Sequence, residues 1–132
     1  MLYYDKKWCK IYYYEDLSCV HLDWFGMAYN DQFQEACNFS LQLLEEKKAN
    51  KMIADNTKSK VVSIESQNWL MENWFPRAYE VGYRTSAVVV STDVFNKVAV
   101  KNITNKMDKG KFTVQYFENL EKAKVWIKKL ND

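Results

Sequence analysis

The chain has 132 residues, of which 48% are hydrophobic and 16% aromatic, and its 19 basic and 17 acidic residues give a net charge of +2. This length predicts one domain, residues 1–132, which can bury enough surface to fold without a disulfide or a metal. The two kinds of charge are interspersed, which argues against a nucleic-acid partner. No segment has the apolar pattern of a signal peptide or a membrane span, so we expect a cytoplasmic protein without an integral membrane segment.

The cysteines and the single histidine argue against a metal centre. Cys9, Cys19 and Cys37 are odd in number and unclustered, which favours free, buried thiols in a reducing compartment. A bridge between Cys9 and Cys19, on paired strands, is the alternative. His21 lies in an alternating strand, where we expect it to be half-exposed. With one histidine and no CxxC motif, we predict no zinc site and no cofactor.

The first half of the chain predicts a hairpin, a helix and a central strand. Residues 8–14 and 18–24 are rich in aromatic and β-branched side chains, which indicates an antiparallel hairpin. A helix is predicted next, with Asn30 as its N-cap, because apolar residues recur at helical spacing as far as residue 44. This helix should end near residues 48–50. Residues 51–55 form a short apolar run, typical of a central parallel strand, before a polar loop.

The segment that follows predicts a second helix and a second central strand. Ser63 can cap this helix, and Pro76 should end or kink it near residue 75. A further helical turn would close at Gly82. The strand is expected within residues 83–91, because its apolar run suits burial on both faces.

The last segment predicts a helix, an outer strand and a final helix. Thr92 is the expected cap of the first of these helices. Its apolar face should consist of Phe95, Val98, Ala99 and Ile103. Residues 112–116 alternate between apolar and polar side chains, which is typical of an outer strand with one face in water. Asn119 should cap the final helix, whose apolar side chains are Leu120, Ala123, Ile127 and Leu130.

The predicted element order is β-β-α-β-α-β-α-β-α. It places the chain in the α/β class, with a mixed, mostly parallel five-strand sheet. Right-handed crossovers should pack helices on both faces of this sheet.

Four passages together link nearly the whole chain to a known family: the opening hairpin, residues 51–55, residues 65–74 with their tryptophans, and residues 117–127 with a Phe, an Asn cap, an Ala and a Trp-Ile pair. In these passages and in element order, the chain resembles the STAS domain, and more closely the small SpoIIAA-like bacterial proteins. The resemblance implies one STAS/SpoIIAA-like domain over residues 1–132, with a non-enzymatic role as in many members.

The resemblance also implies a candidate phosphorylation switch. In the anti-sigma-factor antagonists of this family, a partner kinase phosphorylates a serine at the start of the helix after the central strand, in an Asp-Ser-Ser-Gly pattern. The corresponding region here reads Ser63-Ile64-Glu65-Ser66-Gln67, without the serine pair or the glycine. Ser63 and Ser66 are therefore the candidate phosphosites, and helix capping is the alternative role of Ser63.

Polar residues that follow two of the predicted strands form a second candidate site. Asp55, Asn56 and Thr57 should share the carboxyl edge of the sheet with Ser91 and Thr92, where open α/β sheets bind ligands. Turn formation and helix capping are the alternative roles. Asp55 would suit a nucleophile or a metal carboxylate, but the sequence shows no accompanying catalytic set and gives no distance to Asp23.

Trp69 and Trp74 are candidates for a partner surface or for the wall of an apolar pocket. Each tryptophan adjoins another large apolar residue, Leu70 or Phe75, and adjacent residues of a helix cannot share one direction. One residue of each pair should therefore be partly exposed. The alternative is that the helix is covered on both sides.

These observations predict a non-enzymatic regulatory or protein-interaction module with no catalytic residues. Its partner would be another protein or, in a homodimer, a second copy of the chain. The alternative is a carrier of a small apolar ligand or lipid, with CRAL-TRIO-like architecture. A carrier requires a cavity of at least about a few hundred cubic ångströms between the sheet and the second helix.

Overall fold

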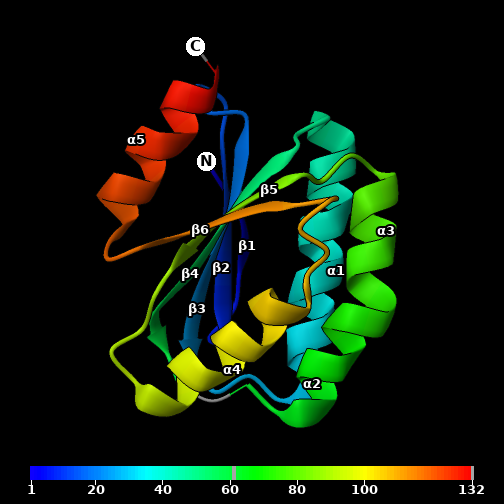
Figure 1. Cartoon of the computed structure of the whole chain (residues 1–132), viewed down its shortest axis with the longest axis vertical. Helices are drawn as coiled ribbons and strands as arrows, with labels where there is room; N and C mark the ends of the chain where they lie inside the picture. The colour runs from blue at the N-terminus through cyan, green and yellow to red at the C-terminus, as the bar shows by residue number, and fades with distance from the viewer. Residues whose placement is uncertain (61, 132) are drawn as a thin grey trace.

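The computed structural model describes residues 1–60 and 62–131, which form one sheet with helices on both faces (Figure 1). The strands are β1 (Leu2–Asp5), β2 (Cys9–Tyr14), β3 (Cys19–Gly26), β4 (Lys51–Ser59), β5 (Thr85–Val89) and β6 (Thr113–Phe117). The helices are α1 (Asn30–Lys47), α2 (Ile64–Trp69), the π-helical η1 (Leu70–Trp74), α3 (Phe75–Glu80), α4 (Val94–Lys106) and α5 (Leu120–Asn131). The α/β class is confirmed, but the sheet has six strands rather than five.

The additional strand is β1, which pairs antiparallel with β2 at one edge of the sheet. The alternation of buried and exposed side chains along β1 is weak, because only Tyr4 is buried. The pairing is also interrupted by a shift of register between Leu2 and Tyr4. Such a short, mostly exposed edge strand has little periodic signal, which explains why sequence analysis misses it.

The strands lie side by side in the order in which they occur in the chain. β1, β2 and β3 pair antiparallel, whereas β3, β4, β5 and β6 pair parallel. Right-handed crossovers that all advance in the same direction place their helices on one face. Helices α1 to α4 therefore share one face, and α5 lies on the other (Figure 1). The prediction of helices on both faces is confirmed.

The face under the crossover helices holds most of the core. Alternate residues of β2 and β3 point toward α1, as the period of a strand requires. The buried side chains of this core include Ile11, Val20, Trp24, Phe33, Leu44, Leu70, Trp74 and Tyr83. Trp74 also donates from Nε1 to the backbone carbonyl of Cys37 over 2.7 Å, which ties η1 to α1.

Residues 64–80 form one continuous helical segment that contains a π-helical stretch. Ser63 caps it by accepting a hydrogen bond from the Ser66 backbone N–H over 3.0 Å. The Phe75 backbone N–H donates to Leu70, five residues back, just before Pro76 enters the first turn of α3. Since proline has no N–H to donate, the wider π turn accommodates it without ending the helix. The segment closes at Gly82, which has a φ of +107°.

Three details of the predicted elements are wrong. Strand β4 does not end at Asp55 but pairs with β3 as far as Ser59. Helix α1 starts after Tyr29 rather than after Asn30, and α4 is capped by the Asp93 carboxylate rather than by Thr92.

The predicted apolar face of α4 is correct only in part: Ala99 is buried and Ile103 packs against the core, but the other two residues do not. Phe95 and Val98 are 74% and 56% exposed, whereas Asn96 and Val100 are buried. The buried face can contain Asn96 because its Nδ2 donates to the Ser59 hydroxyl over 2.9 Å. A polar side chain with a partner therefore occupies a position that periodicity assigns to an apolar one.

The three cysteines are free and buried, as predicted. Among the described residues, no helix is both long and apolar enough to cross a membrane.

Candidate functional site

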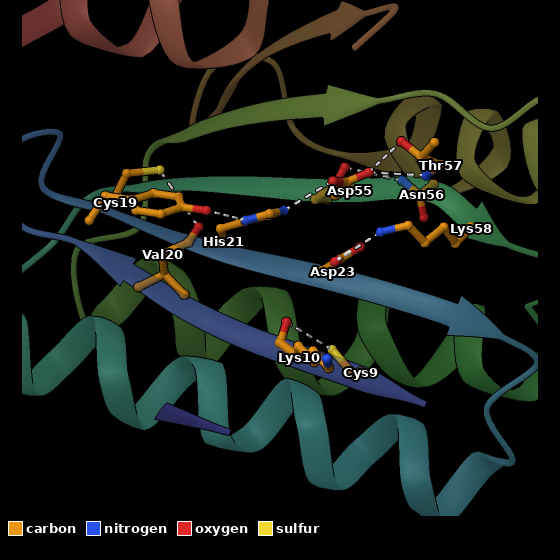
Figure 2. Close-up of polar contacts among 12 residues, drawn as sticks. Cys9, Lys10, Cys19, Val20, His21, Asp23, Asp55, Asn56, Thr57 and Lys58 are labelled. Atoms are coloured by element: carbon orange, nitrogen blue, oxygen red, sulfur yellow. Dashed lines mark hydrogen bonds and ion pairs between the residues drawn. The ribbon is translucent and has the colours of Figure 1, made fainter. Parts of the chain in front are cut away.

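The face of the sheet that carries α5 contains a chain of hydrogen-bonded polar side chains beside that helix (Figure 2). His21 lies in the middle of β3 with its imidazole between two partners. Its Nδ1 is 2.7 Å from the Tyr14 hydroxyl, and its Nε2 is 3.1 Å from Oδ2 of Asp55. His21 is only 2% exposed, so the expectation of a half-exposed histidine is wrong. The rings of Tyr12 and Tyr14 stack against it, which accounts for its burial.

Asp55 is oriented by hydrogen bonds from the same strand. The backbone N–H and the hydroxyl of Thr57 both donate to Oδ1 of Asp55, at 3.1 Å and 2.6 Å. Oδ2 is thereby left to face His21. The pairing of β3 with β4 is irregular at this point, since Asp23 pairs with Asp55 whereas Phe25 pairs with Lys58. The extra residue on β4 brings Lys58 to the same face as Asp55, which strict alternation would prevent.

Asp23 completes the cluster from the position directly across from Asp55. It is 7% exposed, and its Oδ1 is buried without a hydrogen-bond partner in the part of the chain that the structure describes. Its Oδ2 is 3.5 Å from the ammonium of Lys58, whose side chain is mostly in solvent. Two buried carboxylates thus lie on neighbouring strands, with the exposed ammonium of Lys58 close to one of them.

The two carboxyl groups differ in their pKa values for identifiable reasons. Burial raises the pKa of Asp55, but the hydrogen bonds from His21 and Thr57 outweigh burial and hold this pKa below its usual range. Burial, and then the charge of Asp55, raise the pKa of Asp23 above its usual range, and Lys58 offsets only part of the increase. Asp55 is therefore the member of the pair that is stabilised as an anion.

His21, Asp23 and Asp55 can each offer one ligand atom, and these atoms all lie within 4.8 Å of one another. Within the part of the chain that the structure describes, no serine or cysteine hydrogen-bonds to His21. The cluster therefore lacks the nucleophile of a hydrolytic triad. An imidazole held between a tyrosine and a carboxylate can position a proton or hold a cation.

The candidate switch serines lie on the opposite face, at the start of α2. Ser63 is half-buried and donates to Oδ1 of Asn30 over 2.6 Å, while Ser66 is 1% exposed and donates to the same oxygen over 2.9 Å. Asn30, which was expected only to cap α1, instead joins the starts of α1 and α2. It also donates to Glu65 over 2.6 Å.

The residues predicted to share the carboxyl edge of the sheet are placed differently. Asn56 faces the crossover helices, Asp55 and Thr57 face the other way, and the sheet continues beyond all three. Ser91 meets β4 near its end by donating to the Ser59 carbonyl over 3.1 Å. Thr92 is exposed. The structure therefore brings Asp55 and Thr57 together with each other but not with Ser91 or Thr92.

The two tryptophans have different environments. Trp69 is half-buried against Phe33 and Arg77, whereas Trp74 is buried. Their neighbours Leu70 and Phe75 are buried and half-buried, respectively, so one residue of each pair is partly exposed, as predicted.

Trp74 also lines an apolar pocket of about 100 Å³ between the sheet and the crossover helices. Phe33, Met52, Val88 and Ile103 lie in the same wall.

Comparison of the chain with family models, with curated proteins and with solved structures gives no match in any of the three.

Sequence reasoning overlooked the roles of His21 and Tyr14 and left the relation of Asp23 to Asp55 open. One signal was available. His21 and Asp23 are the only charged or titratable side chains between Val20 and Trp24, and they share one face by their spacing of two. Their partner on the neighbouring strand could be found only from the register.

Proposed function

We propose that the protein is a cytoplasmic, non-enzymatic interaction module with STAS/SpoIIAA-like architecture, and that it binds a protein partner at the carboxyl edge of its parallel strands. One observation carries this proposal. Large apolar side chains are exposed where the chain leaves β3, β4 and β5. They are Met27, Tyr29, Ile64, Val94, Phe95 and Val98, and we call them the edge patch.

The fold places the members of the edge patch at the same end of the molecule. They belong to the segments that begin α1, α2 and α4, and these segments lie together at the bottom of Figure 1. The hydrogen bonds from Ser63 and Ser66 to Asn30 fix two of these starts relative to each other. Exposed apolar groups on a rigid support are typical of a surface that binds another protein.

A photo-crosslinking amino acid placed at Phe95 tests the proposal in cells. The matched control places it at Val125, which is 54% exposed on α5, on the other face of the sheet. We expect a protein to be captured from position 95 and not from position 125. Capture of a second copy of this chain from position 95 alone would identify a homodimer. Equal capture from both positions, or capture from neither, would contradict the proposal.

Ser63 is the better of the two candidate switch residues under this proposal. Ser66 is buried, whereas Ser63 is half-buried and lies beside Ile64 of the edge patch. A phosphate on Ser63 would replace the hydroxyl that donates to Asn30 and would repel Glu65. Both variants lose the hydrogen bond to Asn30, but only Ser63→Glu adds a charge beside Glu65, so Ser63→Glu should reduce crosslinking from position 95 more than Ser63→Ala. Equal crosslinking in both variants would remove Ser63 from the mechanism.

The apolar pocket beside Trp74 supports a second candidate function, the binding of a small apolar ligand. Its volume of about 100 Å³ is below what a lipid needs. Any occupant would therefore be much smaller than a lipid. Native mass spectrometry of the protein from its own host, before and after denaturation, tests this function. Mass that is lost on denaturation would support it, and an unchanged mass would argue against it.

A further inference from the structure

The cluster of His21, Asp23 and Asp55 has features that a hydrogen-bonded network alone does not explain. All three residues are more than nine-tenths buried. Two of them are carboxylates on adjacent strands, where like charges destabilise the pairing. Oδ1 of Asp23 has no hydrogen-bond partner among residues 1–60 and 62–131. Buried polar atoms are nearly always paired, so this oxygen is available to an additional partner such as a cation.

We propose that His21, Asp23 and Asp55 bind one divalent transition-metal ion, of the kind represented by Zn²⁺. This site is independent of the edge patch and goes beyond the interaction function proposed above. It also departs from the expectation that a single histidine precludes a metal, because two carboxylates supply the other ligands.

The distances within the cluster are compatible with a common ion. Ligands bonded to zinc at about 2.0–2.2 Å lie roughly 3.4 Å apart in a tetrahedral site. Nε2 of His21 and Oδ2 of Asp55 are already 3.1 Å apart. All the ligand atoms lie within 4.8 Å of one another, so they have little distance to move to share one ion. Three protein ligands would leave one position of the ion for water or another small ligand.

The donor atoms favour a transition metal over calcium or magnesium. Calcium takes six to eight oxygen ligands, and magnesium strongly prefers oxygen. One imidazole with two carboxylates is instead a set that suits zinc and its neighbours.

Cys19, which lies on the same strand, does not compete for the ion. Its buried thiol donates to the backbone carbonyl of Val20 over 3.6 Å, and it does not belong to the group of ligand atoms that lie within 4.8 Å of one another.

The groups that surround the ligands have the arrangement of a second ligand shell. Thr57 holds Oδ1 of Asp55, so that Oδ2 is directed to the site. Tyr14 lies 2.7 Å from Nδ1 of His21. When Nε2 binds the ion, the single ring proton resides on Nδ1 and is donated to the tyrosine oxygen. Such hydrogen bonds commonly fix the orientation of metal-binding histidines and carboxylates.

Lys58 supplies the positive charge near Asp23 in the metal-free protein. Its ammonium is 3.5 Å from Oδ2 of Asp23 and 4.9 Å from the centre of the Phe25 ring. Figure 2 shows the Lys58 side chain reaching toward Asp23. An ion bound to Asp23 would be repelled by this ammonium. The lysine therefore acts as a competing cation, and its removal should strengthen metal binding.

The test is calorimetric titration of the full chain, without an affinity tag and stripped of metal, with Zn²⁺ alone. We expect one ion to bind per chain. Asp23→Asn should weaken binding by at least about tenfold, since it replaces a charged ligand with a neutral one. Lys58→Gln should strengthen binding by about threefold to tenfold. Glu118→Gln, which removes an exposed carboxylate elsewhere, is the matched control and should change nothing.

The opposite effects of the two variants separate a metal site from a structural network. A circular dichroism spectrum of each variant establishes that it is folded before titration. The visible spectrum of bound Co²⁺ provides a second measurement, because its bands report coordination directly and should disappear in Asp23→Asn. Absence of saturable binding by the unmodified chain would overturn the proposal. Equal affinity of the unmodified chain and Asp23→Asn for Zn²⁺ would do the same.

Discussion

The two faces of the sheet bury different kinds of side chain from the same strands. Toward the crossover helices, Val20, Leu22 and Trp24 of β3 enter a continuous apolar core. Toward α5, the intervening residues His21 and Asp23 join a polar cluster. A single helix covers this second face, and tyrosine rings rather than aliphatic side chains enclose the polar groups. One strand therefore contributes to an apolar core on one face and to a hydrogen-bonded polar cluster on the other.

Replacement of Trp74 by alanine should have the largest effect on stability. The change removes a buried ring and its hydrogen bond to the Cys37 carbonyl, so we expect a loss of about 3–5 kcal/mol. Urea unfolding monitored by circular dichroism measures it. Trp69→Ala, which truncates a half-buried ring, is the control and should cost less. Similar losses in the two variants would mean that the crossover face does not depend on Trp74 as described.

Ile127→Ala examines the face under α5. Ile127 is fully buried, but its cluster is smaller and includes Leu17, Ile53 and Ala123. We expect a loss of about 2–3 kcal/mol, in the lower part of the range for a buried isoleucine. The same unfolding measurement applies, with the exposed Val125→Ala as control. A loss larger than that of Trp74→Ala would reverse the comparison between the two faces.

Asp55→Asn should destabilise the metal-free protein by about 1–3 kcal/mol. The substitution weakens the charge-assisted hydrogen bonds from His21 and Thr57, and hydrogen bonds to charged groups contribute more than neutral ones. Unfolding in the presence of a chelator gives the value. Unchanged stability would show that these hydrogen bonds add nothing to the folded state.

Asp23→Asn should instead stabilise the metal-free protein under the same conditions. It removes the repulsion between two directly paired carboxylates, which predicts a gain of about 0.2–1 kcal/mol. Glu118→Gln again serves as the control for loss of a surface charge. A clear loss of stability in Asp23→Asn would mean that the contact with Lys58 outweighs the repulsion.

Phe95→Ser should have the smallest effect, within about 0.5 kcal/mol. Its ring is 74% exposed, so folding gains little from its burial. The unfolding midpoint measures the change. A loss comparable to that of Ile127→Ala would show that Phe95 belongs to the core, and it would remove the main support for the edge patch.

The sequence predicted the features that depend on strong periodicity. The hairpin, α1, the two central parallel strands and the Asn119 cap of α5 agree with the structure. The apolar residues of α4 fit two different faces of the helix. The face that is buried contains Asn96, because its Nδ2 can donate to the Ser59 hydroxyl there. The irregular end of β4 looked like a loop because its residues are polar. Pairing with Phe25 and Gly26 keeps it in the sheet.

The candidate site was harder to predict, because it depends on register. His21 and Asp55 are 34 positions apart in the chain, and only the parallel alignment of β3 and β4 brings them into contact. The burial of His21 depends on the neighbouring tyrosines as well. The rotamers that stack these rings on the imidazole are not encoded by any local pattern.

The sequential order of the strands also has a consequence for how the molecule assembles. Each new strand can dock onto the one made just before it, which keeps loop closures short and favours folding during synthesis. Helix α5 is the exception, since it packs near Leu17, and Asn131 donates to the Leu17 carbonyl across 114 positions of sequence. The face bearing His21 should thus acquire its cover only after the ribosome has made α5. Until then, a nascent chain would expose that face to chaperones.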